Sequence, residues 1–306
     1  MMEFGVHLPQ LGWRATPDAI GEVARQSEAL GYESLWVSDH IAIPEKIETE
    51  YPLGGKFPVP PELPWLDPLG VLCFVAGQTK TARLGTSVLV LPWRPPVQTT
   101  KALITIDQLS EGRLILGAGA GWMPEEFAAL GMPFDHRGAR LSEHLDILEV
   151  LSTEELPEYH GTYYEFEKIG FNPKPVNGRI TLWMGGASEA GYRRAAKRGD
   201  GFQGAYASPS ALRGQWESVK RAAEEAGRDP AEIVLSNRMW LAYGADSGPR
   251  ADGSLFGSTE QIVEQLGELK EMGVQHVVMD VIAGGGIEGR VDMLRRFKEE
   301  VRPQVG

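Results

Sequence analysis

The sequence predicts an α/β protein, namely a (β/α)8 TIM barrel that occupies residues 1–306 as a single domain. Apolar runs of strand length alternate with amphipathic stretches along the whole chain, and eight such runs are present. This alternation indicates parallel strands joined by crossover helices, and eight such units fit a barrel with insertions. A doubly wound open sheet would show the same alternation, and it remains the alternative.

Each predicted strand is a short run rich in apolar residues and bounded by glycine, proline or polar side chains. Runs that are apolar almost throughout are typical of parallel strands, because these are buried on both faces. In chain order, the predicted strands are Phe4–Pro9, Ser34–Ser38, Arg83–Val90, Arg113–Gly117, Ile180–Gly185, Gly201–Ala205, Ile233–Tyr243 and His276–Ile282.

The stretches between these strands carry the signals of helix ends. Thr16 before Pro17 predicts an N-cap and a first helical residue, and Gly31 predicts the end of that helix. Ser258-Thr-Glu-Gln261 has the spacing of a capping box ahead of an apolar helical face. Gly273 predicts the end of this second helix, just before the last strand. These signals agree with a helix after each strand.

Three segments exceed the minimal repeat, and we predict insertions after strands 2, 4 and 7. Ile41–Trp65 contains six prolines, which favour extended structure and oppose a helix. Pro157–Val176 is aromatic with a glycine at its turn, which indicates a small hairpin. Gly244–Gly257 is rich in Gly, Asp and Ser and is typical of a mobile loop. The first and third follow strands, so we expect them on the C-terminal face of the barrel.

The composition restricts the class of protein. The formal net charge is −12, which argues against a surface for nucleic acid or for anionic membrane. Cys73 is the only cysteine, so neither an internal disulfide nor a multi-thiolate metal site is expected. The first residues lack the features of a signal peptide, and no apolar run reaches the length of a membrane span. We therefore expect a soluble, cytoplasmic protein.

Ser38-Asp39-His40 is the most informative motif, because it follows the second predicted strand. The carboxyl ends of the strands form the face of a barrel that holds active sites, and histidine titrates closest to neutrality. His40 is therefore the candidate catalytic residue. Asp39 points to the opposite side of an extended chain, and His7, which ends the first strand, would lie on the same rim.

Two glycine-rich segments also follow predicted strands. Gly117-Ala-Gly-Ala-Gly121-Trp122 does not match a dinucleotide-binding fingerprint, because Trp122 stands where a third glycine is required. Its backbone could still approach a flat ligand closely. Met184-Gly-Gly-Ala-Ser188 ends the fifth strand and opens a helix, which predicts a phosphate site at the helix N-terminus. Ser188 could cap that helix or bind the phosphate.

Motifs of several other enzyme classes are absent. The chain has no His-Glu-x-x-His, no calcium-loop spacing, no P-loop and no Gly-x-Ser-x-Gly elbow. We therefore predict no metal site and no P-loop kinase or ATPase.

Five short motifs span nearly the whole chain in a specific order. They are Gly5-Val-His-Leu-Pro-Gln10, Trp36-Val-Ser-Asp-His40, Leu84-Gly-Thr-Ser-Val88, Gly112-Arg-Leu-Ile-Leu-Gly117 with Gly119 and Gly121-Trp122, and Trp183-Met-Gly-Gly186 followed by Asp200-Gly-Phe. With these motifs the chain resembles the luciferase-like monooxygenase superfamily. It resembles most the branch of oxidoreductases that use the deazaflavin coenzyme F420.

The resemblance implies a (β/α)8 barrel that binds coenzyme F420, with FMN as the alternative cofactor. Asp39 would hydrogen-bond the deazaflavin ring, and His40 would stand near the reacting carbon as a proton donor or a stabiliser of charge. Ser87 and Val88 match a non-prolyl cis peptide that presses on the ring. The other implied cofactor contacts are Ala120 and Gly121 along the ring or ribityl chain, and Gly185, Gly186 and Ser188 at the phosphate.

One position departs from the resemblance. In the sugar-phosphate dehydrogenases of this branch, a glutamate follows the glycine that corresponds to Gly121, whereas this chain has Trp122. Aromatic rings instead suggest an apolar substrate pocket. Its predicted residues are His7, Trp93 and Trp122, with Trp65 and Phe57 nearby.

We therefore predict an oxidoreductase that transfers a hydride between coenzyme F420 and a small organic substrate, apolar or aromatic. The alternative is a two-component monooxygenase that uses reduced FMN and oxygen, supplied by a partner reductase. A non-catalytic flavin-binding protein is the third hypothesis. The resemblance also implies a homodimer.

Overall fold

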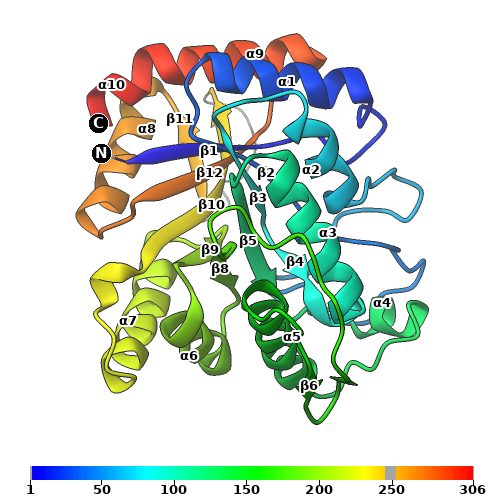
Figure 1. Ribbon diagram of the computed structural model, residues 1–306. Coiled ribbons are helices and arrows are strands. Elements are labelled where there is room, and N and C mark those ends of the chain that lie inside the picture. Colours follow the sequence, from blue (N-terminus) through cyan, green and yellow to red (C-terminus); the bar gives the residue numbers. More distant parts are fainter. Residues whose placement is uncertain (1, 245–252, 306) are drawn as a thin grey trace.

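The computed structural model describes residues 2–244 and 253–305, and its main sheet closes on itself into a barrel (Figure 1). All pairings of the ring are parallel, and β10 pairs with both β9 and β12, so the eight-stranded ring has no open edge. The predicted barrel is confirmed and the open sheet is excluded. In ring order the strands are β1 (Glu3–His7), β2 (Ser34–Val37), β3 (Arg83–Thr86), β5 (Leu114–Gly119), β8 (Thr181–Gly185), β9 (Gly201–Ala205), β10 (Val234–Tyr243) and β12 (His276–Val281).

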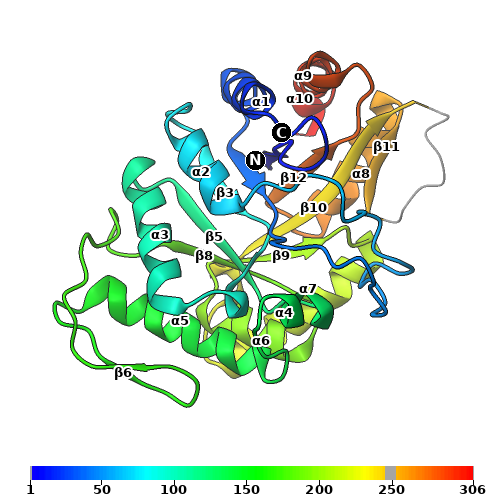
Figure 2. The same cartoon turned by 90° about the vertical axis from the view of Figure 1, so that its right-hand side faces the viewer.

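The helices surround this barrel on its outside (Figure 2), and α1 and α9 lie side by side in both views. The predicted helix starts are confirmed, because Thr16 accepts from the amide of Ala19 and the Ser258–Gln261 capping box has both of its hydrogen bonds. The helices are α1 (Pro17–Ala29), α2 (Pro68–Ala76), α3 (Pro96–Leu109), α4 (Pro124–Ala129), α5 (Arg137–Thr153), α6 (Glu189–Arg198), α7 (Pro209–Glu225), α8 (Thr259–Glu271), α9 (Gly286–Arg296) and α10 (Arg302–Val305), with short turns η1 (Leu91–Trp93), η2 (Pro230–Glu232) and η3 (Phe297–Val301). Among the described residues, no helix has both the length and the apolarity needed to cross a membrane.

The third predicted strand, Arg83–Val90, is wrong as a single element. It is divided into β3 and β4 (Leu89–Val90), and both parts pair with β5. The peptide bond between Ser87 and Val88 is cis, as the resemblance implies. The ladder with β5 is interrupted here because the hydroxyl of Thr86, in place of a backbone group, accepts from the amide of Gly117 and donates to its carbonyl, while the carbonyl of Ser87 accepts from the buried side chain of Arg238.

Two of the three predicted insertions have the expected form. Ile41–Trp65 contains no helix, and its one isolated bridge joins Trp65 to Leu11. The segment Pro157–Val176 contains the antiparallel hairpin of β6 (Tyr159–His160) and β7 (Glu165–Phe166).

The third predicted insertion, Gly244–Gly257, is corrected in part. Residues 245–252 of this predicted mobile loop lie outside the described residues. Its last residues form a strand, β11 (Ser254–Gly257), that pairs in parallel with the end of β10. The reason is that β9 pairs with β10 only as far as Arg238, which leaves the edge of Trp240–Tyr243 free for another strand.

Two indole rings fill one end of the barrel interior. Trp36 and Trp183 lie with ring centroids 5.1 Å apart and pack with Ile115 and Val278. They fit because neighbouring strands carry glycine at the facing positions. A Cβ on Gly85 would lie 2.4 Å from the ring of Trp36.

Three of the four buried histidines in the described residues predict how stability changes in acid. Burial lowers the pKa of His7 and His276 to about 3 and that of His144 to about 4. The unfolded chain therefore takes up protons first as the pH falls below about 6.5, while the folded chain keeps these rings neutral. We expect the free energy of unfolding to fall between pH 6.5 and 4 by at most about 1.4 kcal/mol per pH unit for each histidine.

His276 offers the test of this expectation, because it is remote from the rim. Its ring meets the hydroxyls of Ser34 and Ser236 at 2.7 and 3.1 Å, and asparagine can keep one of these bonds. Urea unfolding between pH 4.5 and 7 should show a shallower pH dependence for His276→Asn than for the parent. If the free energy of unfolding depends on pH equally in the variant and the parent, His276 is not held neutral in the folded state.

Candidate active site

His40 follows β2 and is held by a buried carboxylate. Its Nδ1 lies 2.6 Å from Oε2 of Glu126, which belongs to α4 and is fully buried. The second oxygen, Oε1, accepts from the backbone amides of Ile41 and Ala42 at 2.7 and 3.0 Å. A carboxylate that accepts on both oxygens makes Nδ1 the protonated nitrogen. Nε2 of His40 is then left to give or take a proton.

Four aromatic rings surround the imidazole of His40. The centroids of Trp65, Phe57, Trp93 and Trp122 lie 4.7, 5.0, 5.8 and 6.4 Å from that of His40. This arrangement, which we call the aromatic box, brings together residues from the insertion Ile41–Trp65, from η1 and from the segment after β5. The indole Nε1 of Trp93 is buried without a hydrogen-bond partner among the described residues. The box is therefore apolar, with a free donor and a free imidazole nitrogen.

The Glu126→Gln variant should change which nitrogen of His40 carries the proton. The glutamine oxygen would keep the two backbone amides, so its NH₂ group would face Nδ1 and make that nitrogen an acceptor. We expect ¹⁵N NMR of histidine-labelled protein to show the Nδ1–H form in the parent and the Nε2–H form in the variant. Glu125→Gln is the matched control, because Glu125 binds the amides of Glu48 and Thr49 instead. If the variant keeps the parent tautomer, Glu126 does not orient this ring.

Asp39 points away from His40, as its position in an extended chain predicts. One carboxylate oxygen accepts from the amide of Val90 at 2.9 Å, and the other from Arg94 at 2.6 Å. Burial raises the pKa of Asp39 to about 6, although Arg94 and Val90 oppose this rise. Because the pKa is raised, the folded state holds the proton of Asp39 more tightly than the unfolded state does. This proton stabilises the fold below about pH 4, and the contribution is lost as the pH rises through 6.

A second buried charge lies beside the cis peptide, and sequence reasoning missed it. Arg238 of β10 forms a two-pronged ion pair with Asp280 of β12, with N–O distances of 2.6 and 3.0 Å. Its Nη1 also donates to the hydroxyl of Ser38 at 2.7 Å and to the carbonyl of Ser87 at 2.8 Å. The guanidinium of Arg238 therefore connects the Ser38-Asp39-His40 motif after β2 to the backbone bulge at Ser87 and Val88 after β3.

The predicted pocket residue His7 belongs to this same network. Its Nε2 lies 2.7 Å from the Ser38 hydroxyl, and its Nδ1 lies 3.2 Å from Asp280. Because Arg238 donates to Ser38, the serine proton goes to Nε2 of His7, and Nδ1 donates to Asp280. Burial alone would raise the pKa of Asp280, but the charge of Arg238 holds it at about 2. His7 is therefore a neutral ring of fixed orientation.

The predicted glycines let the side chain of Val88 pack closely against the ends of β5 and β8. A Cβ placed on Gly119 or Gly185 would lie 2.5 or 2.7 Å from a methyl carbon of Val88. Gly121 has φ of +80°, and a Cβ there would lie 2.8 Å from Phe127. These positions require glycine, so the backbone after β5 and β8 stays close to the bulge. We call Ser87, Val88, Gly119, Gly121 and Gly185 the glycine cradle.

The start of α6 is open, as the predicted phosphate site requires. Gly186 has φ of +119°, and a Cβ there would meet nothing within 4 Å. The side chain of Ser188 accepts from the amide of Gly191 and caps the helix, which is the first of the two predicted roles. Arg137, on the neighbouring α5, donates its Nε to the carbonyl of Gly121 at 3.1 Å. A guanidinium is thus held at the end of the glycine cradle.

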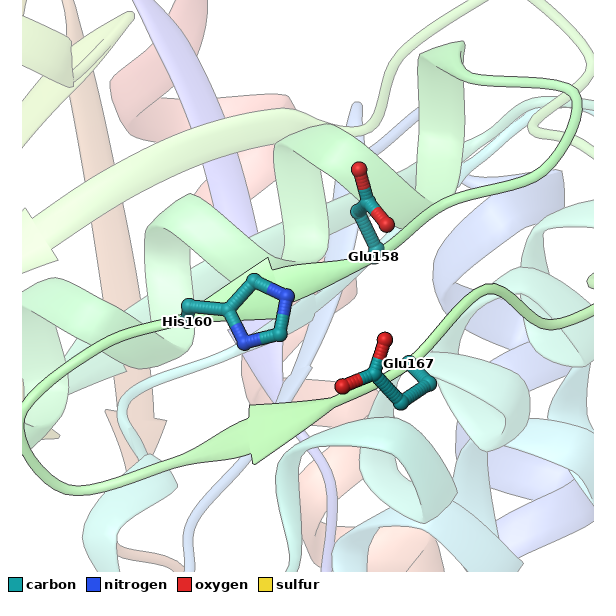
Figure 3. Close-up of side chains that lie close together, drawn as sticks. All are labelled: Glu158, His160 and Glu167. Carbon is teal, nitrogen blue, oxygen red and sulfur yellow. The ribbon is translucent and has the colours of Figure 1, made fainter.

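Possible metal ligands gather away from this rim, on the hairpin of β6 and β7 (Figure 3). One ligand atom from each of Glu158, His160 and Glu167 lies within 4.8 Å of the others, and all three residues are exposed. Exposed carboxylates are stably hydrated without a metal. We therefore assign no role to this cluster.

Part of the missed network carried a signal in the sequence. Arg238 and Asp280 stand inside the predicted strands Ile233–Tyr243 and His276–Ile282. Charges inside buried strands need partners, and these two strands are neighbours in a barrel. Glu126 carried no such signal, because acidic residues in the first turn of a helix are ordinary.

Comparison with known proteins gives the family. The family model of luciferase-like monooxygenases matches residues 2–247. An uncharacterized protein of Mycobacterium tuberculosis is 33% identical over 214 residues, which cover 69% of this chain and 74% of the relative. An F420-dependent glucose-6-phosphate dehydrogenase of Amycolatopsis mediterranei is 30% identical over 261 residues, which cover 81% of this chain and 73% of the relative.

Solved structures share the fold over the whole chain. An F420-dependent secondary alcohol dehydrogenase in complex with an F420-acetone adduct has a TM-score of 0.82 at 19% identity, covering 100% of this chain and 99% of that one. The oxygenating constituent of 3,6-diketocamphane monooxygenase from Pseudomonas putida, in complex with FMN, has a TM-score of 0.77 at 18% identity, with the same coverage. At these identities the likeness establishes the fold alone. Because the family model matches residues 2–247, which are most of this chain, the chain belongs to the luciferase-like monooxygenase family.

Proposed function

We propose that this protein is a coenzyme F420-dependent oxidoreductase that transfers a hydride between the deazaflavin and a small apolar or aromatic substrate. The observation that carries the proposal is the buried pair of His40 and Glu126 inside the aromatic box. It provides one oriented proton-transfer nitrogen among aromatic rings, and the phenol ring of Tyr51 packs against two of these rings, Phe57 and Trp122. The F420-dependent dehydrogenase that is 30% identical supports the choice of cofactor.

The described residues fit a flat ring with a phosphate-bearing chain. The bulge at Ser87 and Val88, packed against the cradle glycines, would press on one face of a planar group, and the open start of α6 offers amides for a phosphate. The unpartnered Nε1 of Trp93 is a buried donor without an acceptor. The residues proposed to hold the cofactor are Asp39, Ser87, Val88, Ala120, Gly121, Gly185, Gly186 and Ser188.

The chain's own residues would orient the substrate and move a proton. When bound, the deazaflavin supplies a carbon that accepts or donates a hydride. His40 would give or take the matching proton at Nε2, while Glu126 holds its Nδ1–H. The aromatic box would exclude water and bury an apolar substrate against Trp93 and Trp122. His7 would form one wall of the pocket.

The substrate class follows from the chemistry of the box. Among the rings around His40, Trp122 stands where a sugar-phosphate dehydrogenase of the F420 branch would have a glutamate. An indole cannot accept a proton from a sugar hydroxyl. We therefore propose an apolar alcohol, ketone, enone or aromatic compound rather than a sugar phosphate.

An FMN-dependent monooxygenase that works with a reductase is the second candidate. Membership in the luciferase-like monooxygenase family supports it, and the FMN-bound constituent of 3,6-diketocamphane monooxygenase is one protein that shares the fold. Both cofactors are flat, tricyclic and phosphorylated, so the glycine cradle does not separate them. The choice between F420 and FMN therefore rests on which cofactor the protein binds more tightly.

Titration of the purified protein with both cofactors decides between these functions. We expect oxidised F420 to bind at micromolar concentration or below and FMN to bind at least about tenfold more weakly, a difference of about 1.4 kcal/mol. A panel of apolar alcohols, ketones and enones, followed by the fluorescence of oxidised F420, would then identify the substrate. Tighter binding of FMN, with oxygen consumption in the presence of a flavin reductase, would favour the monooxygenase. Binding of either cofactor without turnover of any substrate would favour a binding protein.

Gly186→Val tests the phosphate site. The side chain would cover the open amides at the start of α6, and we expect cofactor affinity to fall at least about tenfold. Gly178→Val is the matched control, because Gly178 also has a positive φ, +76°, and open space around it. Both variants are strained by φ, so both should lower the melting temperature, but only the first should weaken binding. Equal affinity of both variants would place the phosphate elsewhere.

A further inference from the structure

A cavity of about 320 Å³ opens beside the rim between α1 and α9. One wall is apolar and is formed by Leu11, Leu63 and Ile287, with Trp13 at the edge. The indole of Trp13 is 71% exposed, the most exposed of the large apolar side chains in the described residues. The volume lies in the range of pockets that hold small organic ligands.

Two guanidinium groups line the same cavity without partners. Neither Arg14 nor Arg290 has a hydrogen bond or an ion pair with any residue in 2–244 or 253–305. Unpaired arginines facing one cavity are unusual in a chain with a net charge of −12. Burial lowers the pKa of Arg290, and the charge of Arg14 lowers it further.

The acidic groups nearby do not neutralise this pair. Asp280 is close enough to oppose the shift of Arg290, but its oxygens already accept from Arg238 and Tyr206. Asp18 and Glu288 lie in the first turns of α1 and α9, and neither forms an ion pair with the two arginines. The cavity therefore keeps an uncompensated positive charge.

The backbone beside the arginines adds to this charge. The chain passes from β12 into α9 through Gly284, Gly285 and Gly286, and a Cβ on Gly286 would lie 3.6 Å from Nη1 of Arg14. Arg14 thus stands at the amino end of a helix, where the helix dipole repels a cation. A bound anion would remove this repulsion and satisfy both guanidinium groups.

We propose that this cavity binds a small organic anion, with its carboxylate or phosphate between Arg14 and Arg290 and its apolar body against Leu11, Trp13 and Ile287. Bidentate hydrogen bonding by guanidinium suits either oxyanion. The site is separate from the aromatic box, with which it shares no lining residue. It lies on the other side of the loop after β1, whose Gln10 binds the carbonyl of Ser38.

The test uses the 306-residue protein labelled with 5-fluorotryptophan. Its sequence contains eight tryptophans. The Trp13→Phe variant assigns the resonance of Trp13 in the ¹⁹F spectrum. Phenyl phosphate and benzoate are titrated as the two anionic probes, and phenol as the neutral probe. We expect the Trp13 resonance to shift saturably with at least one anion, with Kd below about 10 mM, and not with phenol.

Variants of the two arginines test whether their guanidinium groups bind the anion. Arg14→Met with Arg290→Met should weaken the Trp13 response at least about tenfold, whereas Arg213→Met, on α7, should leave it unchanged. The dispersed ¹⁹F spectrum shows that each variant is folded. Shifts of Trp65 or Trp122 without Trp13 would place the anion in the aromatic box and overturn the proposal. An unmoved Trp13 resonance, or one that responds equally to phenol, would overturn it as well.

Discussion

The His40→Ala variant is expected to lose hydride transfer by about 10²- to 10⁴-fold while it still binds the cofactor. The physical reason is that Nε2 of His40 is the one oriented proton-transfer nitrogen in the aromatic box, and Glu126 already holds Nδ1. The cofactor contacts proposed above lie on other residues, so affinity should change little. Single-turnover kinetics with a substrate from the panel and a cofactor titration measure the two quantities separately.

A histidine far from the rim is the control for this variant. His160→Ala removes an exposed ring on the hairpin of β6 and β7 and should react as fast as the parent. Turnover of His40→Ala at the parent rate would remove the proposed role of this residue. A parallel loss of cofactor binding would instead indicate that the aromatic box collapses without the imidazole.

Replacement of Arg238 by methionine should reduce the free energy of unfolding by about 3–5 kcal/mol. The change leaves Asp280 buried and charged without its partner, and it frees the hydroxyl of Ser38 and the carbonyl of Ser87. Denaturation in urea at pH 7 measures the loss. The pKa of Asp280 should rise from about 2 once the guanidinium is gone. The stability of the variant should therefore increase as the pH is lowered toward 5, because the folded state then takes up the proton.

The double variant Arg238→Met, Asp280→Asn separates charge from packing. It removes the unpaired carboxylate, so we expect it to recover a large part of the lost stability. A double variant no more stable than Arg238→Met would show that the loss comes from the hydrogen bonds to Ser38 and Ser87. This comparison remains informative if the single variant does not fold.

The strands were predictable because each is a local apolar run, and all eight barrel strands lie within a few residues of their predicted positions. Two details of the strands were not predictable. The division at Ser87 and Val88 involves long-range contacts, among them the bond from Arg238 to the Ser87 carbonyl, 151 residues away in the sequence. The strand β11 depends on an edge of β10 that only the assembled barrel leaves free.

The placement of the candidate site residues on one rim was predictable where position in the chain alone determines it. His40 and Gly186 follow strands, and the barrel places such residues on one face. The partner of His40 was not predictable, because Glu126 is 86 residues away and its burial depends on α4 docking against the segment after β2. Long-range contacts of this kind leave no local pattern.

Glu125 and Glu126 hold the backbone of the proline-rich segment Ile41–Trp65 in place. This segment has no helix, and its amides at 41, 42, 48 and 49 donate to two adjacent carboxylates of α4. Side-chain charge thus substitutes for a hydrogen-bond ladder. Because Glu126 binds His40 as well, a movement of residues 41 and 42 would also disturb the imidazole. The position of residues 41 and 42 and the orientation of the His40 ring are therefore mechanically coupled through one carboxylate.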